Sequence, residues 1–302
     1  MPNIDVIAFI GFGEAAQAFL EGWRSRADFA SRVIAYDIKT DSPDPAARAG
    51  KRADYAAHHI HGAASAVEAV AQADVIFSVV TVDQAHAAAL ATLPGLRRGA
   101  FFFDCDSCAP QTKVKTAAAV DATGALYVDV AVMAPVHPRL HRTPLLIGGL
   151  HARDGADALL ALGMQLELHA GPVGAASAVK MVRSIAIKGL EALVCECVLA
   201  GEKAGVIDAV LDSLDDTYPG FDWRKRSAYM LERVMTHGVR RAAEMREVAL
   251  TVEGLGFDSA MSRASVEWQQ KIGDLKLDAK AIGDGDFHAL ARALIAKLDN
   301  AH

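Results

Sequence analysis

The hydrophobic positions up to about residue 170 form short continuous runs, rich in Val, Ile, Phe and Tyr. Between these runs lie Ala-rich stretches with helical spacing, such as Glu14–Trp23, Ser65–Ala71, Gln84–Ala91 and Gln111–Ala122. Because strands that are buried on both faces of a parallel sheet read as continuous apolar runs, the pattern predicts a doubly wound α/β domain. The predicted strands are Ile4–Ile10, Val33–Tyr36, Val75–Val80, Phe101–Phe103, Leu126–Val132, Leu145–Ile147 and Leu166–Leu168.

The pattern changes at Gly171-Pro172-Val173-Gly174, after which no further series of strands follows. Ser177–Ala204 has one long helical pattern that is apolar over most of its surface, so we expect this helix to be buried. Shorter helices are predicted at Val206–Leu214, Trp223–Val234, Val239–Leu250, Ser259–Lys276 and Phe287–Leu298. We therefore predict an α/β domain over residues 1–172 and an all-helical domain over 173–302, linked by the long helix.

The first predicted strand leads directly into Gly11-Phe12-Gly13-Glu14-Ala15-Ala16, which opens a helix. Gly11 permits a tight turn, and Gly13 lets the backbone approach a pyrophosphate at the positive end of that helix. Ala16 stands at the third glycine position, where a small residue still allows close packing of helix and strand. Gly11, Phe12, Gly13, Glu14 and Ala15 therefore predict a Rossmann-like dinucleotide-binding domain; the alternative is a glycine turn without a nucleotide.

Asp37 ends the second predicted strand, where a carboxylate accepts hydrogen bonds from the ribose hydroxyls of a dinucleotide. The same carboxylate repels a 2′-phosphate, so NAD is expected as the cofactor. Lys39 is near enough to moderate this preference, and NADP stays the alternative.

Composition excludes several classes of protein. The chain has 302 residues, of which 52% are hydrophobic and 23% charged, which suits a large core and argues against disorder. The net charge of -6 and the lack of a long basic run disfavour a nucleic-acid partner. No uncharged apolar stretch reaches the roughly 18–20 residues of a membrane span, and the N-terminus lacks a basic region typical of a signal peptide. We expect a cytoplasmic protein with reduced cysteines and no metal site.

Polar residues form a stripe on the first half of the long helix: Lys180, Arg183, Ser184, Lys188 and Glu191 fall within an arc of roughly 140°. On a mostly apolar helix, such a stripe must face water, opposite charges or a pocket. One interpretation is structural ion pairing, Lys188 with Glu191. The other is that the stripe lines a substrate pocket, where Lys180 exchanges a proton with a hydroxyl or carbonyl oxygen while Arg183 and Lys188 hold a carboxylate.

These features resemble the β-hydroxyacid dehydrogenase family, which includes 6-phosphogluconate and 3-hydroxyisobutyrate dehydrogenases. Ser78-Val79-Val80-Thr81 and the segment from Asp104 to Pro110 lie where the family has its cofactor loops. Residues 171–174 resemble the glycine motif that precedes the family's catalytic lysine. The resemblance implies that Lys180 is the general acid/base, that hydride passes directly between substrate and nicotinamide, and that Val80, Thr81 and Ser107 lie at the cofactor.

The chain departs from the family pattern at the substrate motif. Met133 stands where the family usually has Ser-Gly-Gly, and Ser184 stands where it usually has Asn. In the helical domain, His237 and Arg241 share a face with Glu244, which predicts either a second polar wall of the pocket or a surface ion pair between Arg240 and Glu244. The predicted substrate-binding residues are Ser107, Met133, Arg183, Ser184, Lys188, His237 and Arg241.

The predicted function is NAD(P)-dependent oxidation of a small anionic hydroxyacid, or reduction of the matching oxo acid or aldehyde. The family resemblance also implies a homodimer formed through the helical domain. One alternative is imine reduction, which related folds perform. The other is a non-catalytic regulatory protein that binds NAD(P), which the missing Ser-Gly-Gly motif leaves open.

Overall fold

The computed structural model describes residues 4–283 and 285–300. Two compact units meet between Lys180 and Met181, inside a long helix. The predicted domain boundary lies at 172/173, in the loop before this helix, and stays a prediction.

The first unit contains an eight-stranded sheet in the order β3-β2-β1-β4-β5-β6-β7-β8. All neighbouring strands are parallel except β6 and β7, which are antiparallel. The strands are β1 (Val6–Ile10), β2 (Arg32–Tyr36), β3 (His61–Gly62), β4 (Val75–Ser78), β5 (Phe101–Asp104), β6 (Leu126–Val132), β7 (Leu145–Gly148) and β8 (Leu166–Leu168). The strand order reverses between β1 and β4, and doubly wound sheets bind ligands at the carboxyl ends of the strands beside such a reversal.

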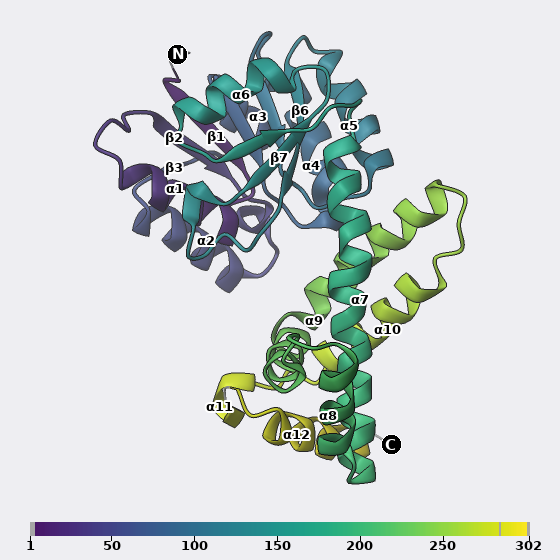
Figure 1. Ribbon diagram of the computed structural model, residues 1–302. Helices are drawn as coiled ribbons and strands as arrows, with labels where there is room; N and C mark the ends of the chain where they lie inside the picture. Colours follow the sequence, from purple (N-terminus) through teal and green to yellow (C-terminus); the bar gives the residue numbers. More distant parts are fainter. Residues whose placement is uncertain (1–3, 284, 301–302) are drawn as a thin grey trace. The chain divides into compact units, whose positions relative to one another are not determined.

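Helices cover both faces of this sheet (Figure 1). They are α1 (Glu14–Arg24), α2 (Pro45–Ala57), α3 (Ala66–Val70), α4 (Ala85–Thr92), α5 (Pro110–Asp121) and α6 (Ala152–Ala161), with short 3-10 helices η1 (Ile38–Asp41), η2 (Val82–Gln84), η3 (Leu93–Gly95) and η4 (Leu140–Arg142). Along β1, Ile7 and Phe9 pack with α1 and α6, whereas Ala8 and Ile10 pack with α3, α4 and α5. Both faces need apolar side chains, which explains the continuous apolar runs.

The second unit is helical throughout the part of it that the structure describes. Helix α7 (Ala175–Ala204) begins in the first unit and continues into this one, followed by α8 (Ile207–Thr217), α9 (Trp223–Gly254), α10 (Ala260–Gly273), α11 (Ala279–Gly283) and α12 (Phe287–Asp299). Its core contains Val198, Leu231 and Leu290, all fully buried. Within residues 4–283 and 285–300, no helix has the length and apolarity needed to cross a membrane.

The predicted fold class is confirmed: a Rossmann-like doubly wound sheet precedes an all-helical region reached through a long helix. The prediction of two helices over 223–250 was wrong, because α9 runs unbroken through Gly238. A Cβ at Gly238 would clash with the backbone of Gln269 and Gly273 on α10. The glycine therefore permits a close approach between helices and does not end one. Helices α2, α6 and α11 and the short strand β3 were not predicted.

Helix α7 is less buried than its apolar sequence predicts. Val182, Ile187 and Leu193 are each more than two-fifths exposed, at 49%, 43% and 58%. The second unit covers other sides of the helix, including Val194 and Val198. A stripe of apolar surface is therefore left open on the single chain.

A buried histidine joins η4 to α1. His141 is 5% exposed, and neither ring nitrogen has a hydrogen-bond partner among the described residues. Its ring lies so close to Gly22 that a Cβ on that glycine would clash with it. Burial, followed by the charges of Arg142 and Arg26, lowers the pKa of His141.

This histidine makes the fold sensitive to mild acid. A group whose pKa is lower in the folded than in the unfolded state stabilises the fold fully above its unfolded pKa, about 6.5 for histidine, and the contribution is lost as pH falls toward the folded pKa. We expect the melting temperature to fall between about pH 7.5 and 5.5, and to fall less in His141→Leu. Equal acid sensitivity of the two proteins, followed by calorimetry, would contradict this role.

Candidate active site

The loop after β1 crosses close to the loop after β4. Gly11 has φ +84°, and its backbone N donates to the Tyr36 carbonyl at 2.8 Å. A Cβ at Gly11 would lie 2.8 Å from Val80 Cγ1 and 2.9 Å from the Val79 oxygen. Both the backbone angle and the neighbouring loop therefore require glycine here.

Gly13 differs from Gly11 in its surroundings. It is the N-cap residue of α1, and a Cβ there would meet no heavy atom within 4 Å. Protein packing therefore does not explain the glycine, whereas a pyrophosphate at the helix N-terminus does, because it has to approach the backbone closely.

A cavity of about 270 Å³ lies at the carboxyl ends of β1, β2 and β4. Five of the predicted cofactor residues line it, namely Gly11, Gly13, Asp37, Val80 and Thr81. The cavity thus occupies the place where the strand order reverses, and its glycine and carboxylate groups fit the pyrophosphate and ribose of a dinucleotide.

The remaining predicted residues of the loop lie elsewhere. The Phe12 side chain is fully buried and packs against Phe9 and Tyr55, so it anchors the loop to the hydrophobic core. Glu14 and Ala15 form the first turn of α1 and do not line the cavity of about 270 Å³. Their contact with a cofactor stays a prediction.

Asp37 is tied to the glycine loop through a lysine that the sequence did not reveal. Asp37 Oδ2 accepts a hydrogen bond from Phe12 N at 2.9 Å and lies 3.7 Å from Lys51 Nζ. Lys51 is only 6% exposed and donates to the Phe12 carbonyl at 2.7 Å and to Asp54 at 2.7 Å. Lys51 therefore holds both the loop and the carboxylate in place. It lies on α2, which the apolar pattern did not predict.

A second buried carboxylate joins the loops after β4 and β5. Asp106 is 3% exposed; its oxygens accept hydrogen bonds from Ser78 Oγ at 2.6 Å and from Val80 N at 2.7 Å. Burial, with the nearby Asp104 carboxylate, raises the pKa of Asp106 to about 8. Asp106 thus fixes Val80 at the cavity wall and the loop that continues to Ser107.

Lys180 and Ser107 lie together in the first unit. Lys180 Nζ donates to Ser107 Oγ at 2.6 Å, and both residues are half-buried. Lys180 lies in the second turn of α7, whereas Ser107 follows β5, so the pair is separated by 73 positions in the chain. An amine and a hydroxyl at this distance can pass or share a proton with a bound hydroxyl or carbonyl group.

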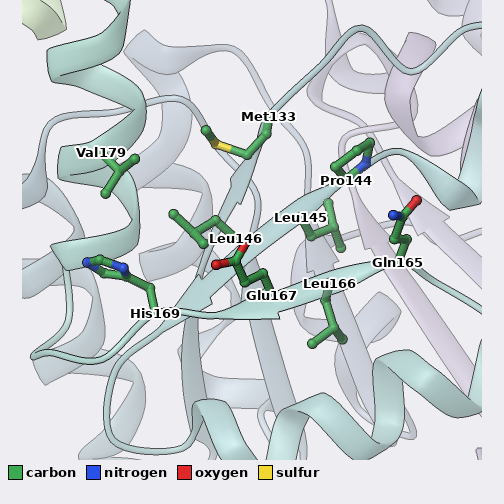
Figure 2. Close-up of a pocket in the computed structure, with 9 residues that line it drawn as sticks. All are labelled: Met133, Pro144, Leu145, Leu146, Gln165, Leu166, Glu167, His169 and Val179. Carbon is green, nitrogen blue, oxygen red and sulfur yellow. The ribbon is translucent and has the colours of Figure 1, made fainter.

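Met133 lines a different cavity, of about 620 Å³, on the face of β6, β7 and β8 (Figure 2). Its walls include Leu146, Glu167, His169 and Val179, and the side chain of Met133 points into it (Figure 2). Val179 directly precedes Lys180 on α7. The role of Met133 in substrate binding stays a prediction.

The other predicted substrate residues belong to the second unit, where two of them form ion pairs. Lys188 lies 2.7 Å from Glu244, and Arg241 pairs with Glu191. Both cations are at least nine-tenths buried. The predicted pairing of Lys188 with Glu191 was therefore wrong, because each of these two residues of α7 pairs with a residue of α9 instead.

Burial is the main cause of the pKa shifts in the Arg241–Glu191 pair. It raises the pKa of Glu191 and lowers the pKa of Arg241, and in each case the charge of the partner acts in the opposite direction. Of the remaining predicted residues, Arg183 is exposed, Ser184 is buried and His237 is half-buried. Substrate binding by these residues stays a prediction. No group of three or more His, Cys, Asp or Glu side chains suited to a metal ion occurs among the described residues.

The sheet order, the Gly11–Gly13 turn and the cavity between them define a Rossmann-type dinucleotide-binding domain. A family model described as the NAD binding domain of 6-phosphogluconate dehydrogenase matches residues 6–153, and one for a domain of unknown function (DUF1932) matches residues 202–272. The chain belongs to the β-hydroxyacid dehydrogenase family and carries a C-terminal helical domain. Its cofactor is NAD(P), and its class is that of the NAD(P)-dependent oxidoreductases.

Several solved structures share the fold of this chain. A conserved hypothetical protein from Sinorhizobium meliloti 1021 is 38% identical, with a TM-score of 0.74 over 97% of this chain and 96% of that one. The conserved protein MTH1747, described as structurally similar to 3-hydroxyacid dehydrogenases, is 25% identical, with a TM-score of 0.68 over 93% and 99%. The 3-hydroxyisobutyrate dehydrogenase of Mycobacterium tuberculosis shares the fold at 18% identity, with a TM-score of 0.70 over 97% and 99%.

The two glycines of the loop predict a separable effect on stability and binding. Gly13→Ala meets no protein atom, so its melting temperature should stay within about 2 °C of the wild type while its Kd for NADH rises at least about tenfold. Gly11→Ala should lower the melting temperature and also raise the Kd for NADH, because its backbone is strained and its Cβ clashes with Val80. Fluorescence titration measures the Kd for NADH and calorimetry measures the melting temperature of both variants. An unchanged NADH affinity in Gly13→Ala would contradict the assigned binding mode.

The raised pKa of Asp106 predicts a loss of stability as pH rises from acid to slightly alkaline values, which levels off above about pH 8. Its pKa is raised from 3.8 to about 8 in the fold, so the folded state retains a proton that the unfolded state releases. Stability therefore falls as pH rises through the folded pKa, at most by about 1.4 kcal/mol per pH unit. Asp106→Asn keeps an acceptor for Val80 N and should flatten this slope in denaturant unfolding between about pH 5 and 8. The same slope in both proteins would refute the assignment.

Proposed function

We propose that this protein oxidises a small anionic hydroxyacid, or reduces the matching oxo acid or aldehyde, with Lys180 as the general acid/base. The observation that carries the proposal is the hydrogen bond of 2.6 Å between Lys180 Nζ and Ser107 Oγ, in the same unit as the dinucleotide cavity. NAD(P) supplies a hydride acceptor or donor at the substrate carbon.

In the oxidation direction, the carbon loses a hydride and the hydroxyl loses a proton. The Lys180 amine takes that proton, and Ser107 Oγ orients both the amine and the substrate oxygen. In reduction, the Lys180 ammonium gives a proton to the forming alkoxide. Oxidation therefore starts from the neutral amine of Lys180, and reduction starts from its ammonium form.

NAD is the preferred cofactor under this proposal. Asp37 lines the cavity at the end of β2, and its carboxylate opposes a 2′-phosphate. Lys51, 3.7 Å from Asp37, and Lys39, which lines the same cavity, moderate that repulsion. We therefore expect NADP to be used less well but not refused.

The chain also has a surface that suits the homodimer implied by its family. Val182, Ile187 and Leu193 on α7 and Val239 and Leu250 on α9 are exposed apolar residues of the second unit. Exposed apolar residues of this kind, where they adjoin, are typical of protein–protein contacts. Sedimentation at several concentrations would distinguish a dimer from a monomer.

The function is tested by a screen of hydroxyacids with NAD and with NADP, followed by the absorbance of the reduced cofactor. With any substrate so found, Lys180→Met should lower kcat by about 10²–10⁴-fold and leave NADH binding intact. Lys115→Met, the same substitution at an exposed lysine of α5, is the matched control.

Wild-type turnover by Lys180→Met would overturn the lysine mechanism. Reduction of cyclic imines without turnover of any hydroxyacid would favour an imine reductase. Tight NADH binding without turnover of any compound would favour a regulatory protein.

A further inference from the structure

A fully buried lysine lies between the two segments that carry Ser107 and Lys180. Lys113 is on α5, and its side chain is 0% exposed. Its Nζ donates to the backbone oxygen and to Oδ1 of Asp104, both at 2.7 Å, and lies 3.7 Å from Asp129 Oδ1. Burial opposes its charge, but Asp104 and Asp129 outweigh that effect and raise its pKa, so Lys113 is an ammonium ion.

The contact with Asp104 fixes the segment that leads to Ser107. Asp104 is the last residue of β5, and its Oδ1 also accepts a hydrogen bond from Asp106 N at 3.1 Å. Tyr127 OH donates to its other oxygen at 2.6 Å. The hydrogen bond to Asp104 Oδ1 thus fixes the backbone at Asp106, which directly precedes Ser107.

The contact with Asp129 fixes the segment that leads to Lys180. Asp129 lies on β6 with no exposed surface, level with Asp104 in the sheet. Its Oδ2 accepts from Gly174 N and Ser177 N, each at 3.1 Å, and its Oδ1 accepts from Ser177 Oγ at 2.6 Å. A carboxylate in this place satisfies the free N–H groups of the first turn of α7 and favours its positive end. Lys180 follows Ser177 by three residues, on the same face of the helix.

We propose that Lys113 is a positioning residue, which through Asp104 and Asp129 holds Lys180 Nζ at hydrogen-bond distance from Ser107 Oγ. The proposal rests on the proposed function in so far as Lys180 is the acid/base group. Without the ammonium, two buried carboxylates face each other uncompensated, and they separate or take up protons or water. Either change moves the Ser107 loop relative to the start of α7, and a displacement of about 1 Å is enough to slow a proton transfer about 100-fold.

One test needs no substrate. The rate at which an N-hydroxysuccinimide ester acetylates Lys180 is measured by peptide mass spectrometry in the wild type, Ser107→Ala, Lys113→Met and the double variant. Ser107→Ala should raise the rate about tenfold, because a charged hydrogen bond no longer holds the amine. Lys113→Met should raise it by a similar factor, and the double variant no further, because both substitutions break the same contact.

Tyr127→Phe is the matched control, since it removes a different buried hydrogen bond to Asp104. It should lower the melting temperature but leave the labelling rate of Lys180 within about twofold. A merely structural role of Lys113 predicts the same behaviour for Lys113→Met. The proposal is overturned if Lys113→Met labels at the wild-type rate, if Ser107→Ala does so, or if the two effects multiply in the double variant.

The second test uses turnover of a substrate found in the screen. Lys113→Met should lower kcat about 100-fold while KM and the Kd for NADH stay within about threefold. If Lys180→Met keeps wild-type turnover, the proposed function fails; if Lys180→Met is inactive but Lys113→Met has the wild-type kcat, only the positioning role fails. Ser177→Ala, which removes one hydrogen bond to Asp129, should show a smaller loss of kcat and replaces Lys113→Met if that variant does not fold.

Discussion

The capping of α7 by the buried Asp129 carboxylate is the interaction on which the arrangement of the candidate active site depends. Through it, the start of the helix that carries Lys180 is fixed beside Asp129 on β6, and Asp129 pairs in the sheet with the last residue of β5. The cofactor cavity is fixed by separate contacts, mainly of Gly11 and Asp106 with the loop after β4. Two sets of contacts therefore meet at Ser107, which follows Asp106 directly and accepts from Lys180.

The charges at this centre are stable only as a group. Asp104, Asp106 and Asp129 are each at most 3% exposed, and Lys113 is the fully buried cation among them. Three carboxylates and one ammonium leave an excess of negative charge in a medium of low dielectric constant, and protonation of Asp106 is the way the fold reduces it. Burial and the neighbouring Asp104 carboxylate thus raise the pKa of Asp106 against the effect of Lys113 and of its own hydrogen bonds, which favour the charged form.

The sequence was sufficient for those features that depend on local pattern. Apolar runs gave the strands, and strand, glycine turn and helix in succession gave the dinucleotide loop, because each depends on neighbours in the chain. The contacts of Lys51 and Lys113 could not be predicted this way, since a lysine in a polar or mixed helix reads as a surface residue. The ion pairs of Lys188 with Glu244 and of Arg241 with Glu191 likewise depend on how α7 lies against α9. The predicted break between Val234 and Val239 includes Gly238, whose close contact with α10 cannot be seen in the sequence.

The difference between the two loop glycines also has an evolutionary consequence. Gly11 is constrained by the protein itself, whereas the space above Gly13 contains no protein atom within 4 Å. A descendant that ceased to use a dinucleotide would be free to drift at residue 13 while still retaining glycine at residue 11. The identity of residue 13 therefore serves as a marker of cofactor use among related chains, one that can be read without knowing any substrate.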